Sequence, residues 1–168
     1  MIAFDPSSLS VGYVSALPPG QLFCHRSRGE DYQLAIRVGG PEPAGWLNLT
    51  GEHAFLLDCL RDPSSTLRVL ALPIMPSELQ LRVDFASGAQ DVSENIAGRL
   101  VFGEGKAHIA TWWKGSDPRY FNTVECDRWA EGREGQPRFI FERWALTYRD
   151  ESGDWVDLVT RTPNLAAP

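Results

Sequence analysis

Two tryptophans stand next to each other at the end of the predicted strand 107–113. Neighbouring residues of a β-strand face opposite sides of a sheet, so Trp112 and Trp113 cannot both point into one core. Trp113 shares its side with small and apolar residues, whereas the side of Trp112 also carries His108. A face that mixes a large aromatic ring with a few polar groups is typical of the wall of a ligand pocket. The same face would also suit a sugar-stacking surface, a partner surface, or a strand covered by loops.

Glu142 lies in the middle of a predicted strand over 138–149. The rest of its face consists of large groups: Ile140, Trp144, Leu146 and Tyr148. A carboxylate buried without a partner among such groups has a raised pKa, which would suit a general acid or the anchor of a ligand. Two ordinary alternatives are a salt bridge to a neighbouring arginine and a bulge that turns Glu142 outward.

These two strands together predict a binding site. Its residues are His108, Trp112, Glu142, Arg143, Trp144 and Tyr148. We expect strand 138–149 to pair with 107–113 or to lie close to it, because only one loop separates them in sequence. The predicted function is binding, without catalysis, of a small and partly apolar ligand, with tryptophan walls and a charge from Glu142 or Arg143. The alternatives are a protein-interaction module of the inhibitor or immunity type, and an enzyme that uses His108 or Glu142 for proton transfer.

The sequence predicts no metal and no cofactor. Its three histidines, His25, His53 and His108, are solitary, whereas zinc ligands usually come in short local spacings. The G-x-S-x-G turn of many hydrolases does not occur. Residues 103–106 resemble a phosphate loop only superficially, because the first glycine and the Ser or Thr after the lysine of that motif are missing.

Composition and charge exclude several classes of partner. The chain has 168 residues, with 16 basic and 22 acidic side chains and a net charge of −6. A negative chain repels phosphate backbones, so no nucleic-acid partner is expected. No apolar run approaches the roughly 20 residues that cross a bilayer, so no membrane segment is expected. The three cysteines, Cys24, Cys59 and Cys126, are odd in number and far apart, which predicts free thiols and a cytoplasmic protein.

The elements that must position these residues are strands. Apolar residues alternate with polar ones in 32–38 and 79–85, which predicts half-buried strands. Turns that contain glycine, at 28–31, 103–106 and 150–154, join neighbouring strands. About ten strands result. The predicted fold is all-β, an antiparallel meander closed as a barrel, with a two-layer sandwich as the alternative.

We expect residues 1–168 to form one β domain, which also includes the following segments. The best helix candidate is 123–131, inside a long loop over 115–137, and a second long loop runs over 86–98. Strand 67–74 is apolar on both sides after its arginine, so it needs cover from a loop, a second layer or another copy of the chain. A homodimer is therefore a possible state.

Overall fold

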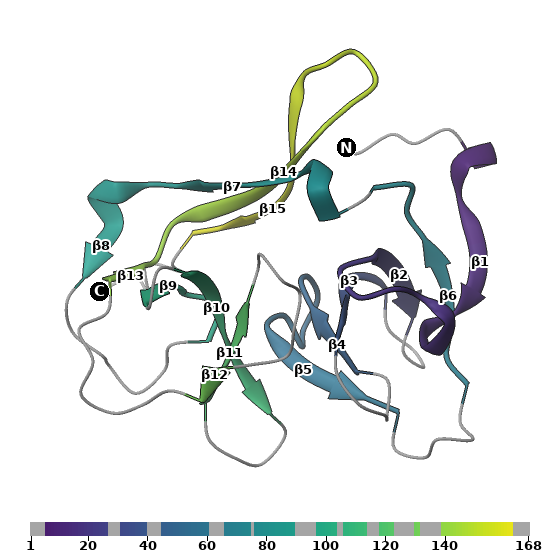
Figure 1. Cartoon of the computed structure of the whole chain (residues 1–168), viewed down its shortest axis with the longest axis horizontal. Coiled ribbons are helices and arrows are strands. Elements are labelled where there is room, and N and C mark those ends of the chain that lie inside the picture. The colour runs from purple at the N-terminus through teal and green to yellow at the C-terminus, as the bar shows by residue number, and fades with distance from the viewer. Residues whose placement is uncertain are drawn as a thin grey trace.

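The structure is a computed structural model, and Figure 1 shows that it is built from strands. The residues that it describes are 6–26, 31–39, 45–60, 66–74, 76–89, 97–103, 106–113, 118–122, 130–131 and 139–162. Within them the chain forms fifteen β-strands and four short 3-10 helices, and no α-helix. The prediction of an all-β fold is therefore confirmed. The four helical segments span three residues each, so none of the described helices could reach across a membrane.

The strands are β1 (Ser10–Tyr13), β2 (Leu22–Arg26), β3 (Tyr32–Val38), β4 (Gly45–Asn48), β5 (Leu56–Cys59), β6 (Arg68–Ala71), β7 (Leu79–Val83), β8 (Gly88–Ala89), β9 (Leu100–Gly103), β10 (Lys106–Trp113), β11 (Pro118–Asn122), β12 (Ala130–Glu131), β13 (Phe139–Phe141), β14 (Trp144–Arg149) and β15 (Trp155–Arg161). The 3-10 helices are η1 (Pro6–Ser8), η2 (Val14–Ala16), η3 (Pro76–Glu78) and η4 (Phe85–Ser87).

Two sheets contain all of these strands. The larger, twelve-stranded sheet has the order β1-β6-β2-β3-β4-β5-β10-β9-β13-β8, and β11 and β12 extend it from β10. The smaller sheet has the order β15-β14-β7. All pairings are antiparallel except the short contact between β5 and β10. The strands that flank the three predicted glycine-containing turns pair as expected, β2 with β3, β9 with β10 and β14 with β15. The meander is interrupted, because β6 lies between β1 and β2, and β7 belongs to the other sheet.

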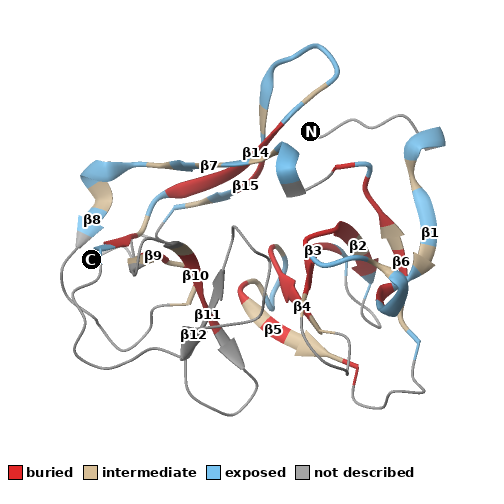
Figure 2. Ribbon diagram, in the orientation of Figure 1, coloured by how far each residue is buried: buried red, intermediate tan, exposed pale blue. Residues whose placement is uncertain are grey.

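One apolar core lies between the two sheets. The smaller sheet contributes the inward side chains of β14 and β15, among them Leu146 and Val159. The larger sheet contributes Ile36, Leu47 and Ile109 to the same cluster. Figure 2 shows buried residues on β14 and on strands of the larger sheet below it. Within the described residues neither sheet closes on itself, so the arrangement fits the two-layer alternative and closure into a barrel stays a prediction.

Two chain segments pass from one sheet to the other at the same corner. One segment leaves β13 and enters β14 through Glu142 and Arg143, and the other leaves β7 and reaches β8 through η4. The two crossings are joined by hydrogen bonds from Asp84 N to Arg143 O (3.1 Å) and from Arg143 N to Ser87 Oγ (3.1 Å). The predicted continuous strand 138–149 is therefore interrupted at Glu142, where a bulge was one of the alternatives.

Other predicted segments differ from the structure. The last two residues of the predicted helix 123–131 form strand β12, and 123–129 lie outside the described residues. The predicted loop 115–137 contains β11 and β12, and the predicted loop 86–98 contains β8. Alternation of apolar residues is short in all three strands, which leaves them without a recognisable pattern in the sequence.

The turn between β14 and β15 contains a carboxyl group, that of Asp150, which we expect to lose its proton at a lower pH than usual. Asp150 Oδ1 accepts hydrogen bonds from Ser152 Oγ (2.6 Å), Ser152 N (2.9 Å) and Asp154 N (2.9 Å). These bonds, that of the Ser152 hydroxyl first, lower the pKa of Asp150 from its usual 3.8. Because the pKa is lower in the folded state, the stabilisation is complete above 3.8 and is lost as the pH falls through the folded-state pKa.

An NMR titration of the Asp150 carboxyl checks this. We expect a midpoint below 3.8, and a rise toward 3.8 in Ser152→Ala, which removes the hydroxyl donor and keeps the backbone bonds. A midpoint at or above 3.8 in the unmodified protein would contradict the turn geometry.

Candidate functional site

The predicted site residues of β14 lie in the core between the sheets. Trp144 and Tyr148 are both buried there. The indole Nε1 of Trp144 donates a hydrogen bond to Gly98 O (2.7 Å), and its ring meets the ring of Phe55 edge-on at 5.8 Å between centroids. Burial, followed by the charges of Asp150 and Glu151, raises the pKa of Tyr148. Both side chains therefore hold the sheets together.

His108 lies on the other side of the larger sheet. In β10 it stands opposite Val101, and Val101 packs with Ala110 and Ile140 in a small cluster of its own. Its neighbour Ile109 points the opposite way, into the core that contains Trp144. The sheet thus separates His108 from the β14 residues. The side chain of Trp112 lies outside the described residues.

The two charged residues of the predicted site occupy the corner between the sheets. Glu142 Oε1 forms a salt bridge with Arg99 Nη2 at 2.7 Å, so the arginine alternative is confirmed. Arg143 Nε pairs with Asp84 Oδ2 at 3.1 Å. This segment does not pair with β10, because β13 pairs with β9, which lies between them. The other half of the prediction, that the segment lies close to 107–113, holds for β13, which is two strands from β10. Of the five predicted residues whose side chains the structure describes, Glu142, Arg143 and Trp144 lie together through chain adjacency alone.

A groove of about 250 Å³ lies along the smaller sheet. Its lining includes Arg82, Asp84, Arg143, Ala145, Asp157 and Thr160. The register explains the hollow, because Ala145 of β14 stands between Arg82 of β7 and Thr160 of β15. A small side chain on the central strand with longer ones on both sides leaves a trough on that face of the sheet. Trp144 also borders the groove, although its ring belongs to the core.

Two ion pairs stand in the groove. Arg82 reaches across the central strand to Asp157, with 3.4 Å between Nη1 and Oδ1, and Arg143 pairs with Asp84 as described above. The Arg82 side chain is 61% exposed and that of Arg143 is 47% exposed, so solvent screens both pairs. A guanidinium has five N–H donors, and each pair uses one nitrogen, so donors remain for a ligand. With Arg161 also lining it, the groove holds more positive than negative side chains, on a chain with a net charge of −6.

A second polar group of residues was not predicted. It lies on the face of the larger sheet that turns away from the smaller one: His25, Gln33, Arg37, Trp46 and Asn48 are all buried there. A ring nitrogen of His25, Nε2, lies 2.9 Å from Asn48 Oδ1, and the rings of His25 and Trp46 meet edge-on at 5.8 Å.

The polar side of the strand 32–38 would suit contact with solvent, but in the structure other residues pack over it. Val14, Leu60 and Val69 pack onto this face with Trp46. No local pattern in the sequence predicts that cover, since its residues come from segments far from β3.

Cys24 and Cys59 form no disulfide, and Cys126 lies outside the described residues. Burial raises the pKa of the Cys24 thiol. The described part of the chain contains no group of three or more His, Cys, Asp or Glu side chains that could hold a metal ion.

Similarity to other proteins does not supply a function for these sites. Comparison of the chain with protein-family models, with curated proteins and with solved structures finds no match in any of the three.

Proposed function

We propose that the protein binds a small, partly apolar ligand that carries a carboxylate, and that the ligand lies in the groove on the smaller sheet. The observation behind this proposal is the placement of two half-exposed guanidinium groups, Arg82 and Arg143, beside the small side chain of Ala145. A carboxylate accepts two parallel N–H bonds from a guanidinium, which makes arginine the side chain best matched to this ligand group.

The other residues that line the groove would contact a polar part and an apolar part of the ligand. Thr160 and Thr162 offer hydroxyl groups on one side, and Ala145 offers apolar surface. Asp84 and Asp157 hold the two guanidinium groups in place through their ion pairs. Because the groove is shallow and open, a ligand keeps part of its surface in water, and weak binding in the micromolar to millimolar range follows.

The site differs from the one predicted by sequence, although Arg143 keeps its role as the charged group. Trp144 contributes to the border of the groove and not as a stacking wall. The groove lies on the face of the sheet turned away from the core, so it would serve an open sandwich and a closed barrel equally.

Benzoate and its neutral isostere benzamide test this site. We expect benzoate to shift the NMR resonances of residues that line the groove, and benzamide to bind about tenfold more weakly or not at all. The double substitution Arg82→Gln/Arg143→Gln should weaken benzoate binding by about tenfold or more, because both donors of charge are lost.

Arg149→Gln is the matched control, because Arg149 is an exposed arginine of β14 that does not line the groove. All three arginines are exposed, so these substitutions should change stability by only about 0.5 kcal/mol. The carboxylate site would be refuted if benzoate and benzamide bound equally well. It would also be refuted if Arg149→Gln weakened benzoate binding as much as Arg82→Gln/Arg143→Gln does.

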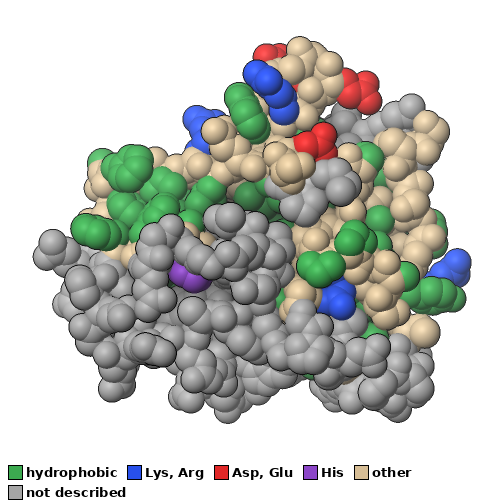
Figure 3. Space-filling view, viewed as in Figure 1, with side chains coloured by type: hydrophobic (Ala, Val, Ile, Leu, Met, Phe, Trp, Pro, Cys, Tyr) green, Lys and Arg blue, Asp and Glu red, His purple; other side chains and the backbone are tan. Residues whose placement is uncertain are grey.

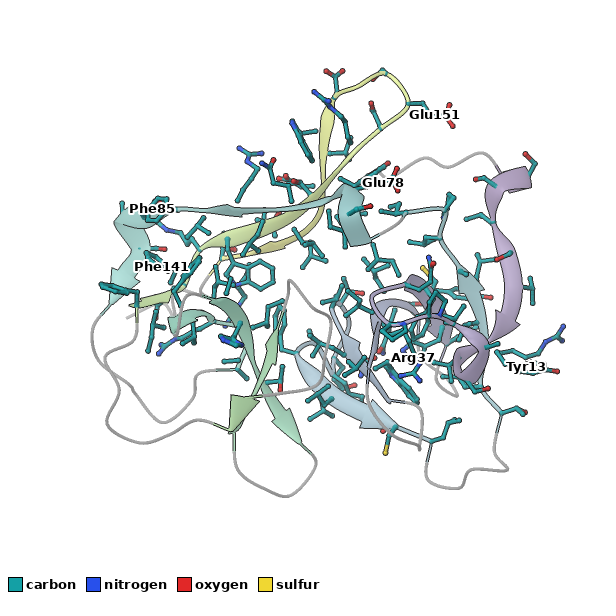
Figure 4. All side chains as sticks on the ribbon, in the orientation of Figure 1. Tyr13, Arg37, Glu78, Phe85, Phe141 and Glu151 are labelled. Carbon is teal, nitrogen blue, oxygen red and sulfur yellow. The ribbon has the colours of Figure 1, made fainter. Side chains whose placement is uncertain are left out.

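A second candidate function is protein binding through an aromatic patch whose exposed residues are Phe85 and Phe139, with Phe102 and the buried Phe141 beside them. Phe85 and Phe139 are 77% and 65% exposed, and the ring of Phe141 meets those of Phe85 and Phe102 edge-on at 5.4 and 5.6 Å. Figure 4 shows Phe85 and Phe141 at one end of the molecule, and Figure 3 shows hydrophobic side chains gathered over β7 and β8 there. Exposed apolar patches mark interaction surfaces.

The partner that we propose for this patch is a second copy of the chain. The ion pairs beside it, Arg143–Asp84 and Arg99–Glu142, each carry both signs, and a rim with both signs can complement itself across a two-fold axis. Sedimentation at micromolar concentration should then show a dimer, and Phe85→Ser/Phe139→Ser should give a monomer. A single 18.7 kDa species in the unmodified protein would reject the homodimer.

A further inference from the structure

We propose that a small inorganic anion, such as chloride, binds between Arg37 and Trp46 on the covered face of the larger sheet. Two N–H groups there, Arg37 Nε and Trp46 Nε1, are buried and have no hydrogen-bond acceptor among the residues that the structure describes. Arg37 and Trp46 stand directly opposite each other on β3 and β4, and only 9% and 6% of their surfaces are exposed. Residues opposite each other on neighbouring strands share a face, so one acceptor can serve both donors.

The charge of Arg37 favours an anion over a water molecule. Arg37 Nη1 donates to two backbone oxygens, Val38 O and Gly45 O, which fix the guanidinium but carry no formal negative charge. Within the part of the chain that the structure describes, no carboxylate forms a salt bridge with Arg37. Buried charges in proteins are normally paired, because an unpaired charge loses its hydration without compensation. Burial also lowers the pKa of Arg37, because it removes water from around the guanidinium.

The neighbouring groups limit where the anion can lie and how large it can be. Asp58 of β5 stands opposite Trp46 on the side away from Arg37, so an anion is repelled from that side and belongs near the guanidinium. His25 is the other titratable neighbour, and its ring lies edge-on to Trp46 while its Nε2 is engaged with Asn48. Phe23, Ala35 and Trp46 pack together in one buried cluster, so the anion that we propose is a monatomic ion and not a metabolite. Figure 4 shows Arg37 among the side chains near β2, β3 and β4.

Thermal unfolding in chloride and in gluconate, at one ionic strength, tests the site. Gluconate is too large to enter a packed face, so it controls for general salt effects. We expect the unfolding temperature to rise by a few degrees with chloride and then to level off, because the ion binds the folded chain alone. A rise that is equal in gluconate, or no rise in either salt, would mean that the two donors bind water or nothing, and would overturn the proposal.

Two substitutions locate the effect. Trp46→Phe keeps an aromatic ring in the cluster and removes the Nε1 donor, and Arg37→Met removes the charge. Each should abolish most of the chloride-specific rise. Trp155→Phe, at an exposed tryptophan of β15, should keep it, as should Arg82→Gln/Arg143→Gln in the groove. An unchanged rise in Trp46→Phe would overturn the site.

A measurement on the unmodified protein covers the case in which Arg37→Met does not fold. The ³⁵Cl NMR line of a chloride solution should broaden on addition of the protein, and bromide should reverse the broadening by displacing chloride. No broadening in the folded protein would contradict the proposal. The groove and the covered face use different arginines, so failure of one site leaves the other standing.

Discussion

Replacing Trp144 by alanine should lower the free energy of unfolding by about 3–5 kcal/mol, as for other large aromatic residues in cores. Trp144 is buried between the two sheets, where its ring packs edge-on against Phe55. Its strand, β14, is also the central strand of the smaller sheet, with β7 on one side and β15 on the other. The cavity left by the substitution would therefore open at the point where the smaller sheet is held to the larger one.

Trp144→Phe separates the packing of the ring from its hydrogen bond. Phenylalanine fills much of the same space but leaves Gly98 O without the indole donor, so a cost of about 1–2 kcal/mol is expected. Urea unfolding curves of the three proteins give both values. A cost under about 1 kcal/mol for Trp144→Ala would show that the ring does not lie in the core between the sheets.

Gly98→Ala should be nearly as damaging, although it adds only a methyl group. The backbone of Gly98 has φ +78°, a conformation that L side chains rarely adopt. A Cβ there would lie 2.4 Å from Phe55 Cδ2 and 2.9 Å from Arg161 Nε, so the ring or the backbone would have to move. We expect a cost of about 3 kcal/mol, which combines the backbone strain with overpacking.

Gly153→Ala is the matched control, because it measures the cost of the strained backbone conformation without overpacking. Gly153 has φ +90° in the turn between β14 and β15, and a Cβ there meets nothing within 4 Å. Its cost should therefore be about 1–2 kcal/mol, from the backbone alone. Equal losses for the two alanine variants would mean that Gly98 does not lie against Phe55.

The sequence predicts the local part of this fold well. Hairpins such as β2–β3 and β14–β15 need only an alternating pattern and a glycine in the turn, and both features are local. The separation into two sheets is not local. At the corner, Arg143 hydrogen-bonds to Asp84 and Ser87, which are far away in the sequence, and the pattern of 138–149 alone shows only that something interrupts the strand there.

The candidate sites were harder to predict for the same reason. The alternating pattern places Arg82 on the polar side of its strand, but only the register with β14 shows that Ala145 lies beside it. From the sequence alone, Glu142 could be either buried or paired with an arginine. Its partner, Arg99, belongs to a distant segment, so no local pattern identifies the pair. The buried donors of Arg37 and Trp46 come from a polar face that sequence assigns to solvent, until Val14 and Leu60 are seen to cover it.

The place of β7 beside β14 has a consequence during synthesis. A ribosome completes β7 roughly 60 residues before the strand that pairs with it, which at about 5–20 residues per second is a delay of roughly 3–12 s. For that time Leu79, Leu81 and Val83, which pack against the core in the finished protein, have no partner strand in the smaller sheet. The nascent chain thus carries an apolar strand with unpaired edges, which is the kind of segment that general chaperones bind.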